Sequence, residues 1–242
     1  MTWIKICGMT NLEDALLAVD AGADAVGFVF YEKSPRCVTV ETAREIISQL
    51  PEEIEKIGVF VDPSADPIGA LLKAKLTGTQ SYISAERVAG ANARRGGFAV
   101  HSLPRQARFV IAFPMSLFAE DVSQIERMAA TFAESRNKHP NIPEGIWDTF
   151  LVDSGNPDLP GGTGKPFDWN KAGPLAESMR RNGLKLIVAG GLRPENVREA
   201  VTTLSPWGVD VASGVESRPG KKDPEKVRAF VRAVREYDRK AS

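Results

Sequence analysis

The chain has 242 residues, of which 43% are hydrophobic and 26% are charged, and these values are ordinary for a globular domain. Lys and Arg together number 31, as do Asp and Glu, and this balance argues against the basic surface that broad nucleic-acid binding needs. Two cysteines are too few for a disulfide scaffold, no signal-peptide pattern is present, and no apolar run could span a membrane, so we expect a cytoplasmic protein.

Short apolar runs alternate with segments of helical spacing along the whole chain. In the first half, the pattern predicts strands at 3–6, 23–30, 55–62 and 78–83 and helices at 11–22, 40–50, 67–76 and 84–95. In the second half, it predicts strands at 108–113, 147–154, 184–190 and 208–214 and helices at 119–137, 169–182, 194–204 and 223–237, with an extra possible strand at 96–102. Strands this apolar, separated by helices, are typical of a parallel sheet buried on both faces. Eight such units predict an α/β fold, a single (β/α)8 TIM barrel over residues 1–242.

The last two predicted strands each end in small residues. Gly190 and Gly191 follow one strand, and Ser213 and Gly214 follow the other. In a barrel of this kind, the loops after strands seven and eight often present backbone N–H groups to a phosphate dianion. Either pair alone could be a tight barrel turn, but the two together favour a phosphate site.

Three side chains that carry chemistry follow other strands. Cys7 ends the first strand, Arg36 lies in the loop after the second, and Asp153 ends the sixth, followed by a GGTG loop that ends at Gly164. Active sites of barrels lie at these strand ends, so a thiol, a guanidinium and a carboxyl group are expected around one opening. The two histidines have no matching ligand spacing, so no metal is expected.

Six segments, in this order along the chain, together resemble the phosphoribosylanthranilate isomerase family: KICGMT (5–10), FVFYEKSPR (28–36), LVDS (151–154), GGTGKPFDW (161–169), VAGGLRPENV (188–197) and VDVASGVESRPGKKD (209–223). The resemblance implies a cofactor-free barrel enzyme of tryptophan biosynthesis. It would convert N-(5-phosphoribosyl)anthranilate into an aminoketose by an Amadori rearrangement. Cys7 then matches the general base, Asp153 the general acid, and Arg36 the arginine that pairs with the anthranilate carboxylate.

The fourth strand departs from the family's pattern. The family usually reads QLHG there, whereas this chain reads QSYI at 80–83, so Gln80 matches and the histidine and glycine are absent. Residues 90–107 are also unlike the family. The departure concerns one wall of the pocket and leaves both predicted proton-transfer residues in place.

The chemistry suits these residues without the family name. Opening a furanose ring needs an acid for the departing ring oxygen, which a protonated Asp153 can supply. The resulting Schiff base acidifies the C2 proton, which a Cys7 thiolate can remove. Lys5 lies two residues before Cys7 and therefore on the same face of the strand, where its charge is expected to lower the thiol pKa.

Plainer interpretations stay open at this point. A cysteine at a strand end is often a small buried hydrophobe, which is the preferred reading of Cys37, and Asp153 or Arg36 could be a turn cap or a solvated loop cation. Lys221 and Lys222 are expected to be a solvated lead-in to the last helix. The functional alternatives are another phosphosugar isomerase or epimerase, or a barrel that binds without turnover. The expected partner is a small phosphorylated substrate, and the chain is expected to be a monomer or homodimer.

Overall fold

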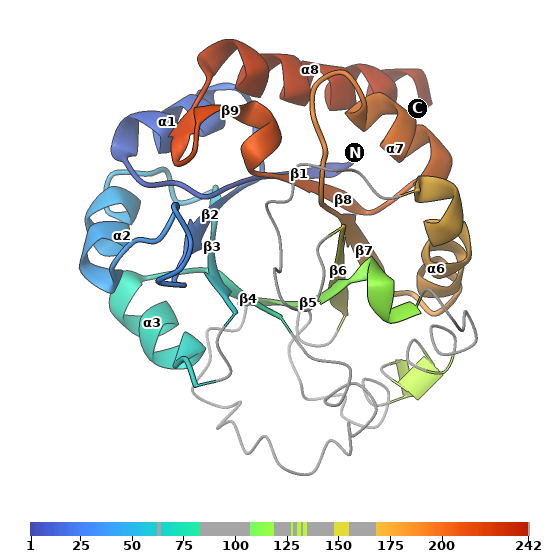
Figure 1. Cartoon of the computed structure of the whole chain (residues 1–242), viewed down its shortest axis with the longest axis horizontal. Coiled ribbons are helices and arrows are strands. Elements are labelled where there is room, and N and C mark those ends of the chain that lie inside the picture. The colour runs from blue at the N-terminus through green and yellow to red at the C-terminus, as the bar shows by residue number, and fades with distance from the viewer. Residues whose placement is uncertain are drawn as a thin grey trace.

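A computed structural model describes residues 1–61, 64–82, 107–118, 148–154 and 168–241, with positions 127, 130, 131, 133 and 134. Within these residues, eight parallel strands close into a barrel in chain order (Figure 1). The barrel closes where β1 pairs with β8, with Lys5 opposite Asp210. The strands are β1 Trp3–Cys7, β2 Ala25–Val29, β3 Glu55–Phe60, β4 Gly78–Tyr82, β5 Arg108–Pro114, β6 Thr149–Asp153, β7 Lys185–Val188 and β8 Gly208–Val211. The predicted (β/α)8 barrel is confirmed.

The described helices pack around the barrel in Figure 1, and three of them begin where the sequence supplies a side-chain cap. Asn11, Thr39 and Asp66 each accept a backbone N–H bond at the start of a helix, which satisfies a donor that the helix itself leaves unpaired. The described helices are α1 Leu12–Asp20, α2 Val40–Ile47, α3 Pro67–Ala74, α6 Trp169–Arg181, α7 Val197–Leu204 and α8 Pro224–Ala241. The predicted elements at 84–95 and 96–102, and most of 119–137, lie outside the described residues. Among the helices that the structure does describe, none combines the length and apolarity needed to cross a membrane.

Alternation along β1 decides which side chains reach the site. Ile4 and Ile6 are fully buried in the core shared with the helices, whereas Lys5 and Cys7 point into the barrel. Gly27 on β2 makes room for them, since a Cβ there would lie 2.7 Å from Cys7 Sγ and 2.9 Å from the Lys5 Cε. A glycine at this close approach therefore allows a lysine and a thiol to share the barrel interior.

Aromatic and charged side chains close the N-terminal end of the barrel. The rings of Trp3 and Trp207 stack with centroids 5.2 Å apart, and the guanidinium of Arg108 lies 4.7 Å from the Trp207 ring centroid. Glu55 accepts two hydrogen bonds from Arg108, of 2.7 and 2.8 Å. This packed layer leaves the opposite, C-terminal end of the strands for a cavity.

The segment after β8 differs from the predicted one. Instead of a single strand over 208–214 and a helix start, β8 ends at Val211 and a short 3-10 helix, η3 Ser213–Val215, follows. Next comes an antiparallel hairpin of β9 Glu216–Arg218 and β10 Lys221–Lys222. The hairpin brings Glu216 and Lys222 toward the barrel, with consequences for the site below.

Candidate active site

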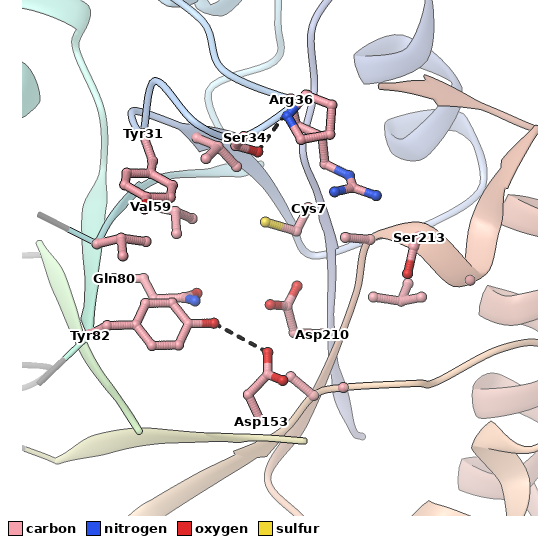
Figure 2. A pocket seen from close by; sticks show the side chains of 18 of the residues that line it. Cys7, Tyr31, Ser34, Arg36, Val59, Gln80, Tyr82, Asp153, Asp210 and Ser213 are labelled. Atoms are coloured by element: carbon pink, nitrogen blue, oxygen red, sulfur yellow. Dashed lines mark hydrogen bonds between the residues drawn. The ribbon is translucent and has the colours of Figure 1, made fainter. Parts of the chain in front are cut away.

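A cavity of about 460 Å³ opens at the C-terminal ends of the strands. It is lined by every predicted site residue that falls within the described part of the chain: Cys7, Arg36, Gln80, Asp153, Gly190, Gly191, Ser213 and Gly214. Gly164 lies outside the described residues. Tyr82 and Asp210, which the sequence reasoning did not select, also line the cavity (Figure 2).

Lys5 joins three strands beneath the cavity floor. Its Nζ donates to Gln80 Oε1 on β4 at 2.8 Å and to Asp210 Oδ2 on β8 at 2.9 Å. Burial lowers the pKa of Lys5, but the carboxylate of Asp210 and the neighbouring Cys7 together raise it above its ordinary value. Lys5 therefore stays a cation, held directly below the thiol.

The Cys7 thiol differs in one respect from the prediction. Burial raises the pKa of Cys7, and the positive charges of Lys5 and Lys222 act in the opposite direction. The Asp210 carboxylate adds to the rise, so the net pKa lies above the ordinary value rather than below it. The expected sign of the lysine contribution was right, but the expected net lowering was wrong because the thiol is only 6% exposed.

Arg36 is held by a partner that sequence reasoning missed. Its Nε and Nη2 donate to the two carboxylate oxygens of Glu216 at 2.8 and 2.7 Å, which is a bidentate pair along one edge of the guanidinium. Hydrogen bonds to Glu216 raise the pKa of Arg36 further. The pair fixes the orientation of the guanidinium, whose side chain also lines the cavity.

Lys222 completes this network and is not the solvated lysine predicted from the sequence. The residue is 1% exposed, and its Nζ donates to the Cys7 carbonyl at 2.6 Å, to Glu216 Oε1 at 2.9 Å and to the Ala212 carbonyl at 3.3 Å. Burial lowers the pKa of Lys222, and the charge of Glu216 opposes this. Because all three partners are acceptors and an ammonium has three donors, the contacts fit the charged form. Lys221 was also predicted to be solvated; its side chain is 31% exposed and pairs with Glu13 and Asp14 at 2.7 Å each.

Asp153 stands across the cavity from Cys7 in Figure 2, at the end of β6. Its Oδ2 accepts a hydrogen bond from the hydroxyl of Tyr82 at 3.2 Å. Asp153 as a whole is 5% exposed. The Tyr82 hydroxyl comes from the end of β4, the strand that departs from the family's pattern. The thiol and the carboxyl group thus face one space from different sides.

The glycine-rich ends of β7 and β8 are packed against each other and against β6. Gly190 and Gly191 have φ values of +81° and +66°, which side chains rarely adopt. A Cβ on Gly190 would collide with Ser154, and one on Gly214 would collide with the Leu192 carbonyl. Asn196 fixes this loop by donating to the Gly191 carbonyl at 3.0 Å and accepting from the Arg193 N–H at 2.7 Å. The glycines are therefore required by backbone shape, and the loops they form line the cavity.

The three residues that sequence reasoning missed share one property: each acts through tertiary contacts. Asp210 lies inside β8, and the parity of the strand places it on the cavity side two residues before Ala212. That parity was available from the sequence. Glu216 and Tyr82 gave no comparable signal, because the hairpin and the β4–β6 contact bring them to the site.

Comparison with known proteins agrees with this geometry. A family model described as N-(5'phosphoribosyl)anthranilate (PRA) isomerase matches residues 4–78 and 117–233. An N-(5'-phosphoribosyl)anthranilate isomerase of Chlorobaculum parvum is 43% identical over 239 residues, which cover 99% of this chain and 97% of the relative. One from Rubrobacter xylanophilus is 40% identical over 241 residues, covering 97% of this chain and 100% of the relative.

Solved structures give the same result in three dimensions. The crystal structure of phosphoribosyl anthranilate isomerase from Thermotoga maritima matches with a TM-score of 0.71 and 33% identity, covering 98% of this chain and 100% of that one. A structure of the enzyme in complex with reduced 1-(o-carboxyphenylamino)-1-deoxyribulose 5-phosphate matches with a TM-score of 0.68 and 31% identity, over 98% of this chain and 100% of that one. The chain belongs to the N-(5'-phosphoribosyl)anthranilate isomerase family.

Proposed function

We propose that this chain isomerises N-(5'-phosphoribosyl)anthranilate to 1-(2-carboxyphenylamino)-1-deoxyribulose 5-phosphate, with Cys7 as general base and Asp153 as general acid. The observation that carries the proposal is that a buried thiol and a carboxyl group line one cavity, with an oriented guanidinium at its rim. Family membership supports the reaction, and the cavity supports the roles.

Only one edge of the Arg36 guanidinium remains for the substrate after the Glu216 pair is made. Glu216 takes the edge formed by Nε and Nη2, so the substrate carboxylate would pair along the end formed by Nη1 and Nη2. Arg36, Glu216 and Lys222 together carry one net positive charge, which suits a carboxylate. The phosphate would lie across the cavity on backbone N–H groups of Gly190, Gly191, Ser213 and Gly214, with Gly164 and Gln80 as further substrate contacts.

Between these anchors the ribose would meet both proton-transfer groups. The proton of Asp153 moves to the ring oxygen, and the bond from C1 to that oxygen breaks as the nitrogen lone pair forms the C1–N double bond. The thiolate form of Cys7, which its raised pKa makes the minor form at neutral pH, then takes the proton from C2. The electron pair of that C–H bond becomes the C1–C2 double bond, and the C–N pair returns to nitrogen. The resulting enolamine tautomerises to the ketone.

Asp210 would bind the substrate with one carboxylate oxygen while the other oxygen binds Lys5. Its Oδ2 pairs with Lys5, whereas its Oδ1 is buried without a hydrogen-bond partner among the described residues. An unpaired buried carboxylate oxygen is costly, and a substrate hydroxyl or N–H would satisfy it. In Figure 2 the carboxylate lies between Cys7 and Asp153, where the reacting part of a bound ribose would be.

A steady-state assay with phosphoribosylanthranilate tests the proposal. Cys7→Ser and Asp153→Asn should each lower kcat by roughly 10²- to 10⁴-fold while substrate binding changes little, because each removes one general acid–base step. Cys37→Ser is the matched control, since Cys37 is exposed. Wild-type kcat in Cys7→Ser would rule out Cys7 as the base.

The remaining expectations concern the setting of the enzyme. A structure of the Thermotoga maritima enzyme is described as a monomeric form generated from a dimeric one, which makes a homodimer one of two states to test here. Sedimentation equilibrium of the purified chain distinguishes monomer from dimer. A cytoplasmic location stays an expectation that fractionation of the source cells would test.

A further inference from the structure

Tyr82 occupies a place in this chain that the family model does not cover. It ends β4 and falls in the stretch 79–116 between the two matched segments. Its ring packs against the cluster of Cys7, Val29 and Val59, and its hydroxyl reaches Asp153 Oδ2 at 3.2 Å. A residue that differs from the family's pattern thus touches the group assigned as general acid.

The Tyr82 hydroxyl is available as a donor. Burial raises the pKa of Tyr82 well above its ordinary value, and the nearby Asp153 carboxyl adds to the rise. Among the described residues, Asp210 on β8 and Cys7 on β1 act on the Tyr82 pKa in the same direction. The phenol is therefore neutral at neutral pH and keeps the proton that it donates to Asp153.

We propose that Tyr82 is a positioning residue that holds the Asp153 carboxyl in the orientation needed to protonate the ring oxygen of the substrate. This inference rests on the proposed function, because it assumes that Asp153 is the acid. The hydrogen bond fixes the carboxyl plane from the β4 side.

The same bond decides which oxygen carries the acidic proton. In the protonated form that the proposal assumes, a carbonyl-type oxygen accepts a hydrogen bond better than a carboxylic O–H oxygen does, so the Tyr82 bond to Oδ2 favours the proton on Oδ1. The ring oxygen then receives its proton from Oδ1. The C1–O bond breaks with its electron pair on the ring oxygen, and the carboxylate that remains keeps the Tyr82 bond.

Tyr82→Phe is the direct test, because it removes the hydroxyl and keeps the ring that packs against the hydrophobic cluster at the cavity wall. We expect kcat to fall roughly tenfold, with KM changed by less than about twofold, since the lost bond acts on Asp153 and not on substrate affinity. Tyr82→His should recover kcat to within about threefold, because an imidazole N–H can donate from the same position. Tyr237→Phe on α8 is the matched control, because it makes the same chemical change outside the cavity.

A double-mutant cycle separates positioning from general support of the fold. If Tyr82 acts through Asp153, then Tyr82→Phe should change the rate by less than about twofold in an Asp153→Asn background, when single turnovers are followed with enzyme in excess. An equal loss in both backgrounds, an unchanged kcat in Tyr82→Phe, or a histidine variant no better than phenylalanine would each overturn the inference. A wild-type chain without turnover would overturn the proposed function and this inference with it. Wild-type turnover with a fully active Tyr82→Phe variant would overturn the inference alone.

Discussion

The two walls of the cavity are held together by different interactions: ion pairs in one wall and side-chain hydrogen bonds in the other. The charged wall, made of Lys5, Cys7, Arg36, Asp210, Glu216 and Lys222, is joined by three buried or half-buried ion pairs. In the opposite tyrosine wall, made of Gln80, Tyr82 and Asp153, the Tyr82 hydroxyl bonds to Asp153 and Gln80 bonds to Lys5 of the charged wall. The family model matches every position of the charged wall but leaves out Gln80 and Tyr82.

This difference follows from the cost of removing one member. A buried ion that loses its partner keeps its desolvation penalty, so single changes in the charged wall should be severe. With Asp153 protonated, as proposed above, the Tyr82 bond joins two neutral groups and is worth about 0.5–1.5 kcal/mol net, so the tyrosine wall can accept a different donor. The wall that departs from the family's pattern is therefore the one where a departure costs least.

Lys222→Met tests whether single changes in the charged wall are severe, and it is the variant with the largest expected effect. The change takes one of two cations from Glu216, which keeps Arg36, and takes the lysine donor from the Cys7 carbonyl, so it should lower the free energy of unfolding by about 2–4 kcal/mol. Urea unfolding measures the loss. Lys171→Met, at an exposed position of α6, should stay within about 0.5 kcal/mol. Equal costs for the two variants would contradict the interdependence of the charged wall.

Arg36→Ala should have the next largest effect, on affinity. Loss of a hydrogen-bonded charge opposite the substrate carboxylate should raise KM roughly 10- to 150-fold. The KM of Arg36→Lys should lie between those of the wild type and Arg36→Ala, because an ammonium keeps the charge but cannot make a bidentate pair. An analogue without the carboxylate should bind the wild type and Arg36→Ala alike. If the wild-type protein bound this analogue and its carboxylate-bearing counterpart equally, the assignment of Arg36 would be refuted.

Gly191→Val tests the third anchor, the phosphate. Inorganic phosphate should raise the Tm of the wild-type chain, because a ligand that binds the folded state stabilises it. This shift should disappear in Gly191→Val, whose side chain stands in the loop that would hold the anion. Gly183→Val is the matched control, since Gly183 has almost the same φ, +65° against +66°, and lies at the end of α6. A shift retained in Gly191→Val would place the phosphate elsewhere.

The sequence predicted the barrel well because its signal is local and repeated. Apolar runs and helical spacing recur along the chain, and the residues at strand ends meet at one edge whatever the details of packing. The common cavity of Cys7, Arg36 and Asp153 was predicted for this reason. Glu216, Lys222 and Tyr82 were not, because their roles depend on a hairpin and on a contact between β4 and β6.

The pKa of Cys7 marks the same limit most clearly. The position of Lys5 two residues earlier was enough to predict a nearby charge and its sign. It was not enough to predict the depth of burial, or that Asp210 across the β1–β8 seam would offset that charge. A sum of opposing contributions needs the distances, and those come only from the fold.

Two variants that should shift the pKa of Cys7 in opposite directions test this balance of charges. Lys5→Met removes a charge that lowers the pKa of Cys7, so the thiol should titrate at still higher pH than in the wild type. Asp210→Asn removes a carboxylate that raises it, so the thiol should titrate at lower pH. The measurement is the ultraviolet absorbance of the thiolate against pH in a Cys37→Ser background, which leaves Cys7 as the one thiol in the 242-residue chain. The Asp210→Asn arm stands even if Lys5→Met folds poorly, because Lys5 keeps Gln80 as a partner there. Shifts of the same sign in both variants would mean that burial, and not these two charges, controls the Cys7 thiol.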